Sequence, residues 1–217
     1  MTDQSIQAHA TNVRRSLETM GAILHTLKFP GDVPDKVRVA LALLRASFDD
    51  AAGLVELARL HGEEFAGACF SLLRPMNEKF KRGTWIAFCA TDEQLQNFLD
   101  GGPLPGGNQM AQAIEKMPPF DQLPVFSKLY ENAGEKFHDF VHGGRQIAGA
   151  YTRGDGIGAA FGAENLKGAL SHSEAVIGTG AQVIIMIAGE VVPDQALRAL
   201  DEFHRVFLPQ QQAASQT

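Results

Sequence analysis

The segment IQAHATNVRRSLETMGAILHTL, residues 6–27, carries the clearest structural pattern in the chain. Its apolar residues recur at spacings of 4, 3, 4, 3, 4 and 3, at Ile6, Ala10, Val13, Leu17, Met20, Leu24 and Leu27. Residues with this spacing share one face of an α-helix. We therefore predict an amphipathic helix from about Asp3 to Lys28, whose apolar stripe must pack against a partner.

A second stripe of the same kind follows a short break. The sequence FPGDVPD, residues 29–35, contains two prolines and a glycine, which interrupt a helix, and Pro34 suits the first turn of the next one. The same spacing then returns at Val37, Leu41, Leu44, Phe48, Ala51, Val55 and Ala58. Two matching stripes joined by a short turn predict an antiparallel helical hairpin, and the hairpin needs further helices to cover it.

The rest of the chain is typical of helices separated by breaks. We predict a helix over Gly62–Cys89 with a kink or break near Arg74, because Pro75 has no backbone N–H to donate. Thr91 and Gln94 predict a capping box for a short helix. We also expect helical turns within residues 110–117, two helical pieces within residues 122–142, a flexible connection over residues 152–163 and a last helix over residues 193–207.

The most apolar stretch, residues 163–192, also has a helical pattern. Its last 18 residues reach the lower limit of a membrane-spanning length, but they include Gln182 and Glu190. We therefore favour a buried core helix over a membrane span or a buried strand, and we expect no contact with a membrane.

These patterns predict an all-α fold, a helical bundle with an N-terminal antiparallel helical hairpin. We expect a single domain over residues 1–208. The polar sequence PQQQAASQT, residues 209–217, is predicted to be a tail without fixed structure.

Composition excludes several classes of protein. The chain has 217 residues, 45% of them hydrophobic, and its 19 lysines and arginines against 25 acidic residues give a net charge of −6. These values exclude a disordered chain and disfavour a general nucleic-acid coat. Cys69 and Cys89 lie in apolar contexts, and the N-terminus lacks an apolar signal core. We therefore expect reduced thiols and a cytoplasmic protein.

The segment SLLRPMNEKFKRGTW, residues 71–85, is the most unusual polar stretch. On a helix, Arg74, Glu78 and Arg82 lie four residues apart on one face. Three interpretations are open. The residues form a solvated ion-pair ladder, a buried network that fixes helix register, or an anion site in which Glu78 orients two guanidinium groups.

A second polar stretch is EKFHDFVHGGRQ, residues 135–146. Here His138 and His142 lie at the i, i+4 spacing that helical metal sites use. A two-metal bundle needs a second such motif, and only Asp201 and His204 partly repeat it, so we expect no metal and no cofactor. Ordinary histidines, acid–base or nucleic-acid-contact histidines and metal ligands remain alternatives. His142, followed by two glycines, is suited to a charged role at a helix end.

Residues 70–99 and the sequence FHDFVHGG, residues 137–144, resemble a group of uncharacterised bacterial helical proteins that are similar to HEPN-like proteins. This resemblance implies a helical bundle, often dimeric, and in some members RNA cleavage in toxin or phage-defence systems. The group's Arg, Glu and His-Gly elements match Arg74, Glu78 and His142. Such ribonucleases also carry an arginine followed by a histidine after four to six residues, as Arg198 and His204 do.

We therefore expect an HEPN-like bundle protein directed at RNA or a nucleotide, and a homo-oligomer. Its candidate catalytic cluster is His142, Arg74 and Glu78, which predicts that His142 lies within about one side-chain length of Glu78 or Arg74. The candidate binding residues are Arg82, Arg145 and His138. Whether the protein is an enzyme stays open. One alternative is a non-catalytic helical interaction protein, and another is a metal-dependent bundle enzyme that uses His138 and His142.

Overall fold

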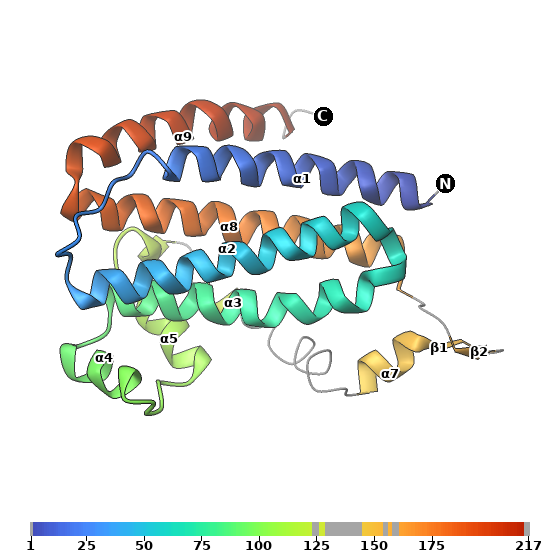
Figure 1. Ribbon diagram of the computed structural model, residues 1–217, viewed down its shortest axis with the longest axis horizontal. Coiled ribbons are helices and arrows are strands. Elements are labelled where there is room, and N and C mark those ends of the chain that lie inside the picture. The colour runs from blue at the N-terminus through green and yellow to red at the C-terminus, as the bar shows by residue number, and fades with distance from the viewer. Residues whose placement is uncertain (1, 123–125, 129–144, 154–155, 158–160, 215–217) are drawn as a thin grey trace.

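In the computed structural model, the chain forms a helical bundle (Figure 1). The structure describes residues 2–122, 126–128, 145–153, 156–157 and 161–214. Its helices are α1 (Thr2–Leu24), α2 (Asp35–His61), α3 (Ala66–Phe88), α4 (Asp92–Leu99), α5 (Gly107–Ile114), α7 (Arg145–Tyr151), α8 (Ala163–Val191) and α9 (Pro193–Ala214), with 3-10 turns η1 (Gly62–Phe65) and η2 (Phe120–Gln122). The predicted all-α fold is confirmed.

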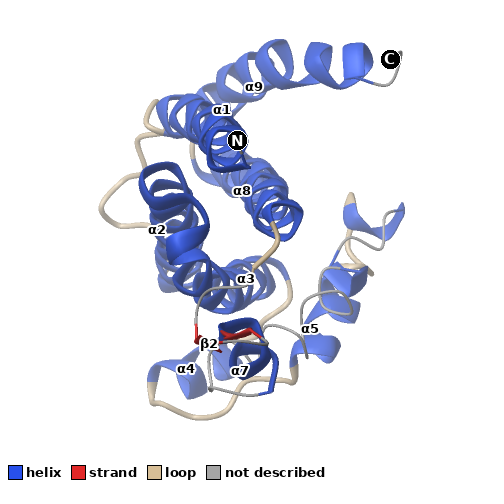
Figure 2. Ribbon diagram, turned by 90° about the vertical axis from the view of Figure 1, so that its right-hand side faces the viewer, coloured by secondary structure: helices blue, strands red, loops and turns tan. Residues whose placement is uncertain are grey.

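Five long helices form the body of the bundle. Viewed end-on in Figure 2, α1 and α9 lie on one side, α3 lies on the other, and α2 and α8 lie between them. The most extensive contact joins α2 to α3, and α8 packs against α1, α2, α3 and α9. The shorter helices α4, α5 and α7 lie on the α3 side of the molecule (Figure 1).

The first two helices do not form a separate pair. They run in opposite directions (Figure 1), but α1 packs more extensively on α8 than on α2, and α2 packs mainly on α3. The predicted N-terminal hairpin is therefore not confirmed as a unit of its own. The apolar stripe of α1 is buried as expected, with Ile23 rather than Leu24 as its most buried residue near the end of the helix.

The apolar run over residues 163–192 forms α8, as predicted for a core helix. Leu166, Leu170, Val176, Ile177 and Ala181 are at most 1% exposed. Within the described residues, α8 is the helix whose length and hydropathy would also suit a membrane span, and half of its apolar window is buried inside the bundle.

The close contact between α2 and α3 depends on a glycine. A Cβ atom at Gly83 would lie 2.9 Å from the Leu44 side chain and 3.0 Å from the Ala40 carbonyl oxygen. Only a residue without a side chain lets the two backbones approach this closely. This contact fixes how α3 is held, and α3 carries the polar residues considered below.

Of the predicted kink or break near Arg74, the break is wrong, because α3 continues from Ala66 to Phe88 with Pro75 inside it, and the kink stays a prediction. Leu73 and Met76, on either side of the proline, are fully buried, and this packing holds the helix together despite the missing backbone hydrogen bond. The helix also begins after the turn η1 rather than at Gly62.

Other boundaries are partly as predicted. The capping box of α4 is confirmed, since the Gln94 backbone N–H donates to the Thr91 hydroxyl and the Thr91 N–H donates to the Gln94 side chain. The expected flexible connection instead contains a two-stranded antiparallel ribbon, β1 (Thr152–Arg153) and β2 (Gly156–Ile157). Helix α9 extends to Ala214, past its predicted end at Phe207. That residues 1–208 form a single domain stays a prediction.

Candidate functional site

A polar face runs along α3 opposite its buried side. Residues 74, 77, 78, 81 and 82 fall within an arc of about 140° at 100° per residue, whereas Leu73, Met76 and Phe80 point into the core and are at most 2% exposed. The five residues are Arg74, Asn77, Glu78, Lys81 and Arg82, and we call them the α3 polar face.

Glu78 lies at the centre of this face and pairs with both arginines. The Arg74 Nε atom donates to Glu78 Oε1 at 2.8 Å, and Arg82 Nη2 donates to Oε2 at 3.4 Å. The exposed fractions of the Arg74, Glu78 and Arg82 side chains are 28%, 36% and 43%. The spacing correctly predicts the two ion pairs, and the ladder is half-buried rather than fully solvated.

One end of the Arg74 guanidinium is not satisfied. Its Nη1 atom is buried and has no hydrogen-bond partner. Among the described residues, it is the only buried side-chain nitrogen or oxygen atom without one. A buried donor without a partner costs about 1–3 kcal/mol and is rare in folded proteins. It therefore marks a position where an acceptor would be stabilised.

Lys81 adds a third cation to the face. The pKa of its ammonium group is lowered, mainly because the group is buried. The charge of Glu78 raises this pKa, whereas the charges of Arg82 and Arg74 lower it. Arg74, Lys81 and Arg82 contribute three positive charges and Glu78 one negative charge. The formal charges of these four side chains sum to +2, in a chain whose net charge is −6.

The polar face is connected to α8 by an amide–histidine pair. Asn77 Nδ2 donates to the Leu73 carbonyl at 2.7 Å, which leaves Asn77 Oδ1 facing His172 Nε2 at 3.0 Å. Since Oδ1 only accepts, His172 donates through Nε2. Sequence reasoning missed both residues. Asn77 lies one helical turn beyond Arg74, and this spacing could have identified it as part of the same face. His172 lies 95 positions from Asn77, and no local sequence pattern indicates that the two are in contact.

Burial lowers the pKa of His172 below its ordinary value of 6.5. The unfolded chain therefore takes up a proton at this histidine before the folded chain does, and folding stability is retained above about pH 6.5 and lost as the pH falls below it. We expect the wild type to lose more stability than His172→Gln between pH 7.5 and 5.5, with a slope of at most about 1.4 kcal/mol per pH unit.

Urea unfolding of both proteins at the two pH values measures this difference, because carboxylate titrations shared by both proteins cancel. Equal losses in the two proteins would show that His172 is not the group responsible.

The aromatic residues at the N-terminal end of the polar face close it off. Tyr151 of α7 lies against Gly67, which leaves no room for a Cβ atom there, and Phe161 stacks on Phe70 with ring centroids 5.3 Å apart. Phe70 and Phe161 are 8% and 6% exposed, so these rings form a wall rather than an open stacking surface.

Comparison with known protein families assigns the chain to a family. A family model described as "Family of unknown function (DUF6988)" matches residues 44–210, a range that contains both α3 and α8. The chain belongs to the DUF6988 family. No curated protein and no solved structure matches it. The α3 polar face and His172 thus lie within the part of the chain that defines its membership of DUF6988.

Several predicted site residues lie outside this face or outside the described structure. His138 and His142 lie outside the described residues, and Arg145 begins α7 with its side chain also outside them. The expected approach of His142 to Glu78 or Arg74 therefore stays a prediction. Within the described part of the chain, no three histidine, cysteine, aspartate or glutamate side chains are grouped as a metal site.

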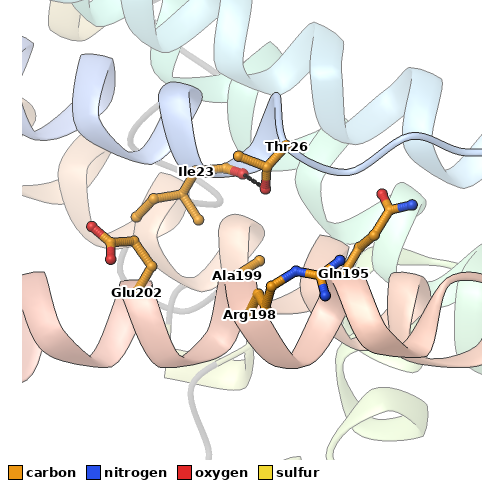
Figure 3. Close-up of a pocket in the computed structure, with 6 residues that line it drawn as sticks. All are labelled: Ile23, Thr26, Gln195, Arg198, Ala199 and Glu202. Carbon is orange, nitrogen blue, oxygen red and sulfur yellow. Dashed lines mark hydrogen bonds between the residues drawn. The ribbon is translucent and has the colours of Figure 1, made fainter.

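The arginine and histidine of α9 do not converge. Arg198 and His204 are both exposed and, six residues apart, point in directions that differ by about 120°. Arg198 instead borders a shallow pocket of about 170 Å³ between α1 and α9, with Ile23, Thr26, Gln195, Ala199 and Glu202 (Figure 3). Figure 3 shows that Arg198 and Glu202 both come from α9, opposite Ile23 and Thr26.

Burial keeps both cysteines of this DUF6988 member in their thiol form. Burial raises the pKa of the Cys69 thiol to about 12 and also raises the pKa of Cys89. Both are free thiols, as predicted. The thiolate is the reactive form of cysteine, so we assign the chemistry of the site to its guanidinium, ammonium, carboxylate, amide and imidazole groups.

Proposed function

We propose that the protein binds an anion, the phosphate of a nucleotide or of RNA, on the α3 polar face. The single observation that carries this proposal is the buried Nη1 atom of Arg74, which has no hydrogen-bond partner. An anionic oxygen would satisfy that donor and would be attracted by the guanidinium groups of Arg74 and Arg82.

The geometry of the ladder supports binding over a purely structural role. An exposed ion pair between residues four apart contributes about 0.3–0.5 kcal/mol, whereas the unsatisfied Nη1 atom costs more than that. A ladder selected only for stability would leave the guanidinium in water or fully paired. Arg74 instead donates Nε to Glu78, which orients the fork and leaves Nη1 for another acceptor.

The proposal assigns binding and no reaction. Glu78 holds arginines on both sides and is best suited to orienting them. The toxin or phage-defence role, a metal-dependent reaction, the homo-oligomer and the cytoplasmic location stay predictions. His142 would add to the α3 polar face if it lies where the sequence predicts.

The proposal is tested with sulfate, a stable dianion. We expect isothermal titration calorimetry at constant ionic strength to show sulfate binding, and Arg82→Gln to weaken it about tenfold, because a charge-assisted hydrogen bond is lost from a partly exposed position. Arg45→Gln is the matched control. Arg45 pairs with Asp49 at the same i, i+4 spacing, but it lies on α2 and its side chain is 68% exposed.

The control variant should bind sulfate as the wild type does. If Arg82→Gln binds sulfate as tightly as the wild type, or if Arg45→Gln weakens binding equally, the α3 polar face is not the anion site.

A further inference from the structure

The pocket between α1 and α9 lies on the other side of the bundle from α3 (Figures 2 and 3). Its floor is apolar, because Ile23 and Ala199 line it and are 5% and 2% exposed. Its volume of about 170 Å³ is close to the roughly 150 Å³ of an apolar cavity that holds one benzene molecule in another protein. The pocket can therefore accommodate a single ring or a short branched chain.

The rim of the pocket carries an arginine, Arg198, that has no hydrogen bond or ion pair with another described residue. In three other places, an arginine pairs with the acidic residue four positions later. Arg198 and Glu202 have the same spacing, but both oxygens of Glu202 accept from Arg205 at 2.6 Å. Figure 3 shows the Arg198 side chain extending away from Glu202 and toward Gln195. Its guanidinium group is therefore available to a ligand in the pocket.

Gln195 provides a second donor beside Arg198. Its Oε1 atom accepts the Lys28 backbone N–H at 2.7 Å, which holds the side chain between α9 and the segment after α1. The amide oxygen is thus occupied, whereas the Nε2 group keeps two N–H donors. Residues three apart on a helix are neighbours, so the guanidinium and the amide present donors on one face. A carboxylate, with two oxygens and a negative charge, matches this pair of donors.

The charges along the pocket indicate where the carboxylate lies. Arg198 forms no ion pair within the described residues, whereas the charge of Glu202 is matched by Arg205. Glu202 also lies seven residues after Gln195, about 10 Å further along α9. One unmatched positive charge suits a monocarboxylate, with its carboxylate at the Gln195 end and its apolar body on the floor of the pocket.

The backbone at the end of α1 favours a small acid over the C-terminus of a protein. The N–H groups of residues 25–27 donate to carbonyl oxygens of α1, and the N–H of Lys28 donates to Gln195. A peptide chain brings carbonyl groups that need donors of their own. These four N–H groups are not available to it, and an acid without a peptide main chain does not need them.

We propose that the pocket between α1 and α9 binds a small monocarboxylic acid with a compact apolar body, about the size of benzoate. Arg198 and the Gln195 amide hold the carboxylate, and Ile23 and Ala199 contact the apolar body. This site is separate from the α3 polar face, and the proposal does not depend on anion binding there.

The test is an NMR titration of the full chain at constant ionic strength with benzoate and with benzamide, which has a similar shape and no charge. We expect benzoate to bind at least about tenfold more tightly, and Arg198→Gln to remove this difference, because a charge-assisted hydrogen bond is lost. Arg15→Gln is the matched control and should bind both probes as the wild type does. Arg15 is also an exposed arginine whose side chain has no described partner, but it lies eight residues before Ile23 on α1.

Nuclear Overhauser effects locate the apolar body without any substitution. The ring protons of bound benzoate should show them to the methyl groups of Ile23 and Ala199. If they are absent while binding still depends on Arg198, benzoate is held by a surface ion pair and the pocket proposal fails.

Three other outcomes would also overturn the proposal. They are no binding of benzoate, equal affinities for benzoate and benzamide, and equal weakening by Arg198→Gln and Arg15→Gln. N-acetylvaline, which mimics a protein C-terminus, should bind less tightly than benzoate, and the reverse order would exclude the small-acid assignment. Arg82→Gln should bind benzoate as the wild type does, so a failure at this pocket leaves the sulfate test of the α3 polar face unaffected.

Discussion

Replacing Phe80 with alanine is expected to lower the free energy of unfolding by about 3–5 kcal/mol, the largest stability effect that we predict for a single side chain. Phe80 is 2% exposed and stacks on Phe126 with ring centroids 5.2 Å apart. A Cβ atom at Gly180 would lie 3.7 Å from its ring, so the ring also rests against α8. One side chain therefore contacts Phe126 and joins α3 to α8.

Chemical unfolding followed by circular dichroism measures this loss, with Phe65→Ala as the matched control. Phe65 is 39% exposed and its ring contacts only His61 among the described aromatic side chains, so its removal should cost about 1 kcal/mol or less. A loss below about 1.5 kcal/mol for Phe80→Ala would show that the ring does not lie in a closely packed core, and that α3 is held against α8 by other contacts.

The properties of the fold that follow from local spacing are the ones the sequence predicts. The stripe of α1 repeats within one helix, and the Arg74–Glu78–Arg82 ladder depends on a four-residue spacing that any α-helix provides. The capping box of α4 is equally local, because it needs only Thr91 and Gln94 three residues apart. Each of these follows from helix geometry whatever the rest of the chain does.

The sequence does not predict the properties that depend on packing between helices. Pro75 lowers helix propensity locally, but the burial of its neighbours keeps α3 continuous. The Asn77–His172 contact depends on how α8 is rotated and shifted against α3, and 95 residues separate the two partners. The burial of Arg74 Nη1 likewise depends on what covers the helix, and the spacing of residues along the sequence does not predict this.

Replacing Arg74 with methionine is expected to reduce sulfate affinity by about ten- to a hundredfold, because this residue would provide the buried donor to the anion. The same change should leave the free energy of unfolding within about 1 kcal/mol of the wild type, or raise it. Methionine keeps an apolar stem of similar reach and removes the unsatisfied Nη1 atom. The lost ion pair is half-exposed and contributes about 0.5 kcal/mol, and Glu78 keeps Arg82 as a partner.

Opposite effects on binding and stability are what distinguish a binding arginine from a structural one, because a site that holds an unsatisfied donor in the free protein sacrifices stability for its ligand. Arg45→Met, on the exposed Arg45–Asp49 pair of α2, should change neither property measurably. For both variants, calorimetry with sulfate measures the binding affinity, and urea unfolding measures the free energy of unfolding. A loss of more than about 2 kcal/mol for Arg74→Met with sulfate affinity unchanged would make the ladder a structural network, because breaking a buried pair on one side leaves the other charge without compensation.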